Sequence, residues 1–158
     1  MVSGAGISVE RRRLLLRPMK ITDVDAMLRI FADPLVTASF GMPPFERRQV
    51  RQWVERNLSH QSKFGYGLSS VILKHNNLLI GDCGLEHADI DGEMVPELGY
   101  DFLSDYWHKG LATEAARAES VGPQESEYPP GRAYKWRSRF SFDGQWLSPF
   151  ANRSGVDT

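Results

Sequence analysis

The chain has 158 residues, of which 41% are hydrophobic and 25% are charged, and its formal net charge is -1. This length and composition predict one globular domain, and the near-neutral charge argues against bulk attraction to nucleic acids or membranes. The single cysteine, Cys83, excludes an intrachain disulfide, and no cysteine–histidine spacing predicts a metal site. The only apolar run near the start, Leu14–Leu16, is too short for an export signal or a membrane span. A cytoplasmic location is therefore expected.

Hydrophobic spacing predicts seven elements in the order β-α-α-β-β-β-α. Strands are indicated by alternating patterns bounded by turn residues, and helices by apolar residues that recur every three to four positions. The predicted strands cover residues 14–16, 66–72, 78–81 and 95–103, and the predicted helices cover residues 22–33, 45–60 and 110–118. The elements belong to a predicted domain over residues 1–118.

The composition changes after residue 118. Residues 119–158 contain four prolines, four glycines and six serines but only three aliphatic branched residues. Such a segment has little material for a core, so an irregular tail is expected. One strand or hairpin is predicted near residues 134–147, where aromatic residues alternate with basic ones before an Asp143-Gly144 turn.

The segment from Pro96 to Ala115 carries the chemistry. It places a strand, a tight glycine-containing loop and a helix N-terminus in succession. Such a loop directs several backbone N–H groups to one place, where the helix dipole adds about half a positive charge. That place suits a pyrophosphate. Gly110 would let the backbone approach the phosphates, and Thr113 offers a hydroxyl donor.

The run Tyr106-Trp107-x-Lys109-Gly110-x-Ala112-Thr113-Glu114-Ala115, following an acidic-Leu-Gly-Tyr strand, resembles the acetyl-CoA loop of the GNAT N-acetyltransferases. The branch that it resembles most is that of the ribosomal-protein N-terminal acetyltransferases. The family signature of Gln or Arg, two residues, Gly, one residue, then Gly or Ala falls on residues 107–112, and Trp107 departs from its first position. The segments 14–18 and 80–85 also resemble strands of this branch.

The resemblance implies an α+β, GNAT-like (acyl-CoA N-acyltransferase) fold with a mostly antiparallel sheet flanked by helices. The later strands of that fold have no counterpart after residue 118, so the C-terminal half is expected to be truncated or irregular. The implied reaction is direct acetyl transfer from acetyl-CoA, as cosubstrate and without a metal, to a primary amine such as a peptide N-terminus or a small amine.

The resemblance also implies roles for particular residues. Glu97 is the candidate base or amine-positioning group, because the attacking amine must lose a proton at neutral pH. A backbone N–H near Tyr100 or Asp101 would polarise the thioester carbonyl, and the strand edge at Phe102 and Leu103 would pair with the pantetheine arm. The predicted phosphate loop consists of His108, Lys109, Gly110, Leu111, Ala112 and Thr113.

Plainer interpretations remain open beside these. The Gly110 loop is also typical of an ordinary β-to-α connection, and Glu97 of a solvated strand carboxylate. Should Glu97 not serve, Glu86 and His87 are next in line. A non-catalytic acyl-CoA-binding or partner-binding remnant of the family is the alternative function. Nucleic-acid and membrane partners are not expected, although the aromatic tail leaves an RNA-binding hypothesis, and homodimer formation is left open.

Overall fold

The computed structural model describes residues 8–39, 41–90, 92–120, 141–142 and 145–146. For residues 87–90, 93–97, 120, 141–142 and 145–146 it describes the backbone only. Five antiparallel strands form one sheet in which the spatial order follows the chain order, β1-β2-β3-β4-β5. The strands are β1 (Val9–Glu10), β2 (Leu14–Pro18), β3 (Leu68–Leu73), β4 (Leu78–Ile90) and β5 (Glu93–Phe102).

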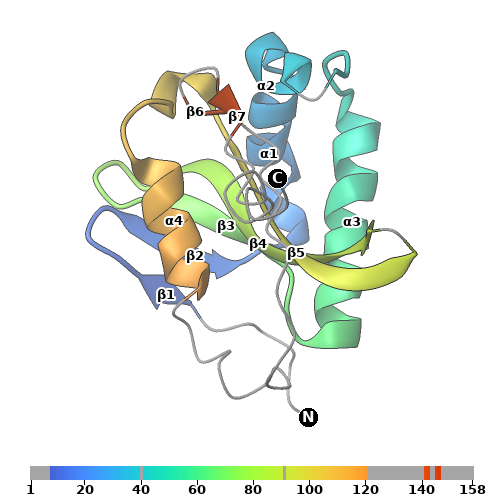
Figure 1. Ribbon diagram of the computed structural model, residues 1–158. Helices are drawn as coiled ribbons and strands as arrows, with labels where there is room; N and C mark the ends of the chain where they lie inside the picture. Colours follow the sequence, from blue (N-terminus) through green and yellow to red (C-terminus); the bar gives the residue numbers. More distant parts are fainter. Residues whose placement is uncertain (1–7, 40, 91, 121–140, 143–144, 147–158) are drawn as a thin grey trace, which may run out of the picture.

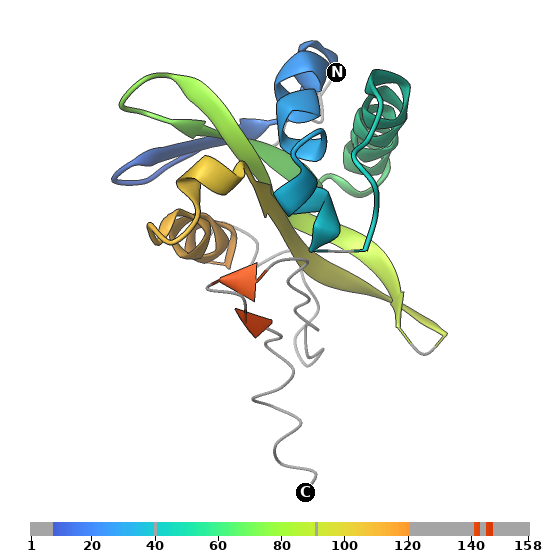
Figure 2. The same cartoon turned by 90° about the horizontal axis from the view of Figure 1, so that it is seen from above.

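Helices cover both faces of this sheet (Figures 1 and 2). Seen from above in Figure 2, α4 lies on one face, and α1, α2 and α3 lie on the other. The α-helices are α1 (Val24–Phe31), α2 (Pro34–Ala38), α3 (Arg47–Phe64) and α4 (Leu111–Ser120), and two short 3-10 helices are η1 (Ile21–Asp23) and η2 (Ser104–Tyr106). The fold class predicted from the sequence, α+β with an antiparallel sheet flanked by helices, is confirmed.

Several predicted boundaries were wrong. The predicted helix over 22–33 is divided into η1 and α1, and a separate helix, α2, follows it. Asp33 caps α2 by accepting a hydrogen bond from the Leu35 N–H at 3.0 Å, and Pro34 occupies its first turn. The second predicted helix runs on from His60 to Phe64, where Gly65, at φ 77°, ends it in the left-handed conformation.

The strands also differ from the prediction. The two-residue strand β1 was missed, because a segment this short has no measurable alternation. Strand β4 does not end at Gly81 but continues to Ile90, pairing with β3 in its first half and with β5 from Gly81 onward. Strand β5 ends at Phe102, so Leu103 lies just outside it. Position 81 requires glycine, because a Cβ there would lie 2.3 Å from the Asp101 carbonyl oxygen.

The core consists of the apolar stripes of the helices against the sheet. On α1 the buried residues are Val24, Met27, Ile30 and Phe31, a spacing that puts them on one helical face. On α4 the buried apolar residues are Leu111, Ala112, Ala115 and Ala118. Because three of these four are alanines, α4 can lie close to β4 and β5. The position of α4 matters for function because its N-terminus forms the candidate site.

In the tail, the structure describes two short strands, β6 (Ser141–Phe142) and β7 (Gln145–Trp146), which pair antiparallel. They fall within the segment where a strand or hairpin is predicted. The predicted Asp143-Gly144 turn and most of residues 119–158 lie outside the described residues. The division of the chain at residue 118 accordingly stays a prediction.

A polar network joins β2 to the start of α1. The Arg17 guanidinium forms a two-pronged contact with the Asp23 carboxylate, at 2.7 and 2.8 Å. The Lys20 N–H and the Ser70 hydroxyl, each at 2.8 Å, donate to the same carboxylate. Burial would raise the pKa of Asp23, but the hydrogen bonds from Arg17, Lys20 and Ser70 and the charge of Arg17 hold that pKa below its usual value.

Replacing Asp23 by Asn should lower the free energy of unfolding by about 2 to 4 kcal/mol at pH 7, because Arg17 then loses its charged partner in a mostly buried setting. The matched control is Asp25→Asn. Its carboxylate also pairs with an arginine, Arg47, but both side chains are more than half exposed, at 77% and 55%, so the expected loss is under about 1 kcal/mol. Urea denaturation measures both.

The pH dependence gives a second measurement of Asp23. A lowered pKa stabilises the folded state above the unfolded value, near 3.9, and this contribution is lost as the pH falls through the folded pKa. The stability difference between the wild type and Asp23→Asn should therefore shrink below about pH 4. Equal losses for Asp23→Asn and Asp25→Asn at pH 7 would contradict the assigned role of the network.

Candidate functional site

The segment predicted to carry the chemistry forms a strand, a loop and a helix. Strand β5 leads through Leu103 into η2, then residues 107–110 turn the chain into α4 (Figure 1). Two residues of the turn have left-handed backbone conformations, His108 at φ 62° and Gly110 at φ 74°. Gly110 adopts this conformation at little cost, whereas His108 is strained there. Left-handed residues in such a turn are typical of backbone segments that gather N–H groups toward one place.

The first turn of α4 presents backbone donors. The Glu114 N–H donates to the Gly110 carbonyl at 3.1 Å, which is the first bond of the helix. The N–H groups of Leu111, Ala112 and Thr113 precede it and have no acceptor inside the helix. A Cβ added to Gly110 would meet no described atom within 4 Å except an Arg13 guanidinium nitrogen at 3.6 Å. The space and the donors together fit an anion such as a pyrophosphate.

Three side chains fix this loop in place. Asp33, at the cap of α2, accepts from the Ser104 N–H at 3.3 Å and also from the Ser104 hydroxyl. The Trp107 indole N–H donates to the Phe102 carbonyl at 2.8 Å. Arg13 donates through Nη1 to the Lys109 carbonyl at 2.8 Å and through Nε to Glu114 at 3.3 Å. Loop residues 104–109 are thus tied at both ends to the N-terminal part of the chain.

Sequence reasoning missed these contacts. Asp33 and Arg13 lie 71 and 96 residues before their partners Ser104 and Lys109, so no local spacing links them. The Trp107 position was recognised only as a departure from the family signature. Its indole has a structural role, because it donates a hydrogen bond to the Phe102 carbonyl at the end of β5.

Strand β5 is the edge strand of the sheet among the described residues. Along it, successive N–H groups point alternately toward β4 and toward the open edge, so the predicted backbone donors fall into two groups. The Leu103 N–H donates to the Ile80 carbonyl at 2.9 Å, so the Asp101 N–H also points toward β4, where Asp101 is paired with Asp82. The N–H groups of Tyr100 and Phe102 point toward the other edge of β5. This favours Tyr100 over Asp101 as carbonyl-polarising donor, and Phe102 over Leu103 as a pantetheine partner.

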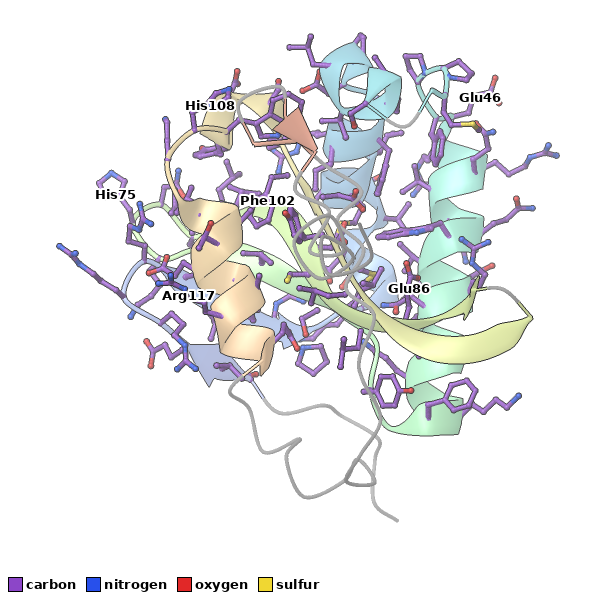
Figure 3. The ribbon with its side chains drawn as sticks, viewed as in Figure 1. Glu46, His75, Glu86, Phe102, His108 and Arg117 are labelled. Atoms are coloured by element: carbon purple, nitrogen blue, oxygen red, sulfur yellow. The ribbon has the colours of Figure 1, made fainter. Side chains whose placement is uncertain are left out.

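The predicted phosphate-loop residues lie together at the N-terminus of α4. His108, Lys109, Gly110 and the Thr113 side chain are exposed, whereas Leu111 and Ala112 are buried, so the latter two can contribute only their backbone. In Figure 3, His108 lies above the upper end of α4, Phe102 is labelled to the right of that end, and Glu86 lies farther to the right, near α3.

The Glu97 side chain lies outside the described residues, and so does that of His87. The backbone of Glu97 pairs with that of Glu86 across β4 and β5, which places the two residues on the same face of the sheet. Glu97 lies five positions before Phe102 on β5, roughly 17 Å away at the usual rise per residue. The role of Glu97 therefore stays a prediction.

Strands β4 and β5 bring two other acids together under complete burial. Asp82 and Asp101 face each other across the strands, 0% and 1% exposed. Burial raises the pKa of Asp101 to about 7, although its hydrogen bond with Asp82 acts in the opposite direction. Burial, with the nearby charges of Glu119, Asp82 and Asp101, also raises the pKa of the Cys83 thiol well above its usual value. Cys83 is therefore an inert buried thiol and not a nucleophile.

Residues 13–120 match the model of the acetyltransferase (GNAT) domain. The chain belongs to the GNAT acetyltransferase family. It is 36% identical over 110 residues to the protein YkkB of Bacillus subtilis (strain 168), a match that covers 67% of this chain and 62% of YkkB. This GNAT chain spans about three fifths of the length of the curated relatives that it matches.

Solved structures of the same fold agree with the family. An acetyltransferase from Agrobacterium tumefaciens str. C58 is 26% identical with a TM-score of 0.66, over 78% of this chain and 70% of that one. A structure described as a ribosomal-protein-serine acetyltransferase from Vibrio cholerae has a TM-score of 0.59 at 15% identity, over 77% and 68% of the two chains. The second likeness is one of fold alone.

Two further observations concern the described residues only. They include no group of three or more histidine, cysteine or acidic side chains placed to hold a metal ion. Among them, no helix combines the length and the apolar character needed to cross a bilayer.

Asp101→Asn should change how the stability of the protein depends on pH. An acid whose pKa is raised in the folded state keeps its proton while the unfolded chain releases it, so its contribution to stability falls as the pH rises from about 4 to about 7. The amide does not titrate, and thermal melting should show a smaller loss of Tm between pH 5 and pH 8 in the variant. Asp105→Asn, at an exposed position of η2, is the control. An unchanged profile in Asp101→Asn would show that this buried pair does not titrate as described.

Proposed function

We propose that this chain binds acetyl-CoA and transfers the acetyl group to a primary amine, such as a peptide N-terminus or a small amine. The observation that carries the proposal is the set of backbone donors at the N-terminus of α4, in a chain of the GNAT family. The donors suit the diphosphate of acetyl-CoA, and the space at Gly110 leaves room for it.

In this proposal each part of the chain has a distinct task. The N–H groups of Leu111, Ala112 and Thr113 bind the pyrophosphate, and the Phe102 N–H pairs with the pantetheine arm. The Tyr100 N–H polarises the thioester carbonyl, which gains negative charge as the amine attacks. Glu97 accepts the proton of the amine directly or through water, since an α-amine with a pKa near 8, or a lysine amine near 10.4, is mostly protonated at pH 7.

Replacing Gly110 by Ala should weaken acetyl-CoA binding by about 5- to 150-fold, equivalent to about 1 to 3 kcal/mol. At φ 74° a side chain is strained, and relief of that strain would turn the donors away from the phosphates. Gly65→Ala is the matched control, because Gly65 has nearly the same φ, 77°, at the end of α3. Titration calorimetry measures both. Equal affinities in Gly110→Ala and wild type would remove the phosphate assignment.

Replacing Glu97 by Gln should lower the acetylation rate by roughly 10²- to 10⁴-fold if the carboxylate is the base, with little change in acetyl-CoA affinity. The rate of CoA release over a panel of amines, followed against pH, makes the measurement. Glu55→Gln, in an exposed pair with Arg51, is the control. If Glu97→Gln keeps the rate and pH profile of the wild type, Glu97 is not the base, and Glu86 or His87 becomes the candidate. Acetyl-CoA binding without CoA release from any amine would instead support a non-catalytic acyl-CoA-binding function.

A further inference from the structure

We propose that Arg13 is a positioning residue for acetyl-CoA: it fixes the phosphate loop and neutralises Glu114 at the start of α4. This inference rests on the proposed function, because it concerns the same phosphate site. Arg13 belongs to the turn between β1 and β2, far in sequence from the loop. Its guanidinium contacts the last part of the loop and the first turn of the helix at the same time.

The backbone of Arg13 is itself held on two sides. Its carbonyl accepts from the Lys74 N–H at 2.9 Å, which joins it to the turn after β3. Its N–H lies 3.4 Å from the Glu114 carboxylate. The Lys74 ammonium also reaches the Arg11 carbonyl at 3.2 Å and the Glu10 carboxylate at 2.9 Å. Arg13 therefore extends from a fixed point of the sheet, which lets its side chain fix the loop in turn.

The contact with the Lys109 carbonyl determines the direction of the loop backbone. Lys109 lies between the two left-handed residues His108 and Gly110. A hydrogen bond of 2.8 Å to its carbonyl holds that peptide unit on the Arg13 side. Because a peptide unit is planar and its C=O and N–H point in opposite directions, the N–H of Gly110 is directed away from Arg13. The guanidinium thus orients a donor that it does not itself contact.

The contact with Glu114 removes an electrostatic conflict. Glu114 lies in the first turn of α4, and its side chain is only 16% exposed. A carboxylate there stabilises an empty helix N-terminus, but it repels a pyrophosphate bound at the same place. Arg13 pairs with it at 3.3 Å, and another nitrogen of the same guanidinium lies 3.6 Å from the Cβ position of Gly110. One arginine therefore compensates the acid at the start of the helix.

The test uses acetyl-CoA and S-acetylpantetheine, which lacks the phosphates, as two probes of the full chain. Arg13→Gln should weaken acetyl-CoA binding by about 10- to 100-fold and S-acetylpantetheine binding by less than about twofold, by analogy with the loss of one charged hydrogen-bond partner. Arg13→Lys keeps the charge but cannot contact both the Lys109 carbonyl and Glu114 as the guanidinium does. Its affinity for acetyl-CoA should lie between those of the wild type and Arg13→Gln. Arg51→Gln, an exposed arginine paired with Glu55 on α3, should bind both probes as the wild type does.

A double-mutant cycle separates neutralisation from general loss of structure. Glu114→Gln keeps an acceptor for Arg13 but removes the negative charge, so it should bind acetyl-CoA at least as tightly as the wild type. Adding it to Arg13→Gln should recover at least about threefold of the lost affinity. Circular dichroism at the titration temperature checks that each variant is folded. If Arg13→Gln is unfolded, the same cycle is measured with Arg13→Lys and Glu114→Gln.

Each outcome decides a separate claim. If the wild type binds no acetyl-CoA, the proposed function fails and the role of Arg13 fails with it. If the wild type binds and the Arg13 variants bind equally well, only the role of Arg13 is overturned. Equal weakening for both probes would show that Arg13 supports the fold without a specific effect on the phosphates. A Glu114→Gln variant that binds as weakly as Arg13→Gln would overturn the neutralisation.

Discussion

The candidate site depends on one constraint: a loop that offers its N–H groups to a ligand cannot use them to hold itself together. Backbone donors that point outward need acceptors, and the loop must be fixed by other contacts. In this chain the fixing contacts come from side chains of the N-terminal part. Asp33 holds the beginning of the loop at Ser104, and Arg13 holds its end at Lys109. Trp107 occupies the carbonyl of Phe102 between them. The N–H groups of Ser104, Tyr106 and Trp107 are used inside the protein, whereas those of the first turn of α4 can be directed toward a ligand.

The same constraint explains why the first helices and strands matter for a site to which they contribute no predicted catalytic group. Arg13 and Asp33 can act only if β2, α1 and α2 are fixed relative to the sheet. The contact of Arg17 with Asp23, at 2.7 Å, joins β2 to the start of α1, and the Ser70 hydroxyl joins β3 to the same carboxylate. Asp33 lies just after the end of α1 and caps α2. The polar network thus sets the position of the residue that holds the first end of the loop.

The sequence predicted the parts of the fold that depend on neighbouring residues. The apolar spacing of Val24 to Phe31 and the glycine before α4 are local signals, and the family pattern over the loop led to the right fold. The predictions failed where pairing between distant segments decides the structure: β1 exists only because it pairs with β2, and β4 extends to Ile90 because β5 accompanies it. The contacts of Arg13 belong to the same class, since nothing near Arg13 in the sequence indicates a partner 96 residues away. The role predicted for Glu97 is not tested by the described side chains.

A loop fixed at both ends also has an energetic consequence for binding. Ordering the backbone of a flexible residue costs about 1 to 2 kcal/mol, so a free loop of several residues would lose much of its interaction energy with the diphosphate in becoming ordered. When the loop is already ordered in the free protein, this entropy is lost during folding and not during binding. The packing of α4 against the sheet then helps to offset it. Strain at His108, φ 62°, is tolerated for the same reason, because the neighbouring carbonyl of Lys109 is held by Arg13. If the chain binds acetyl-CoA as proposed, the affinity should therefore depend on Arg13 and Asp33, which fix the two ends of the loop from the N-terminal part of the chain.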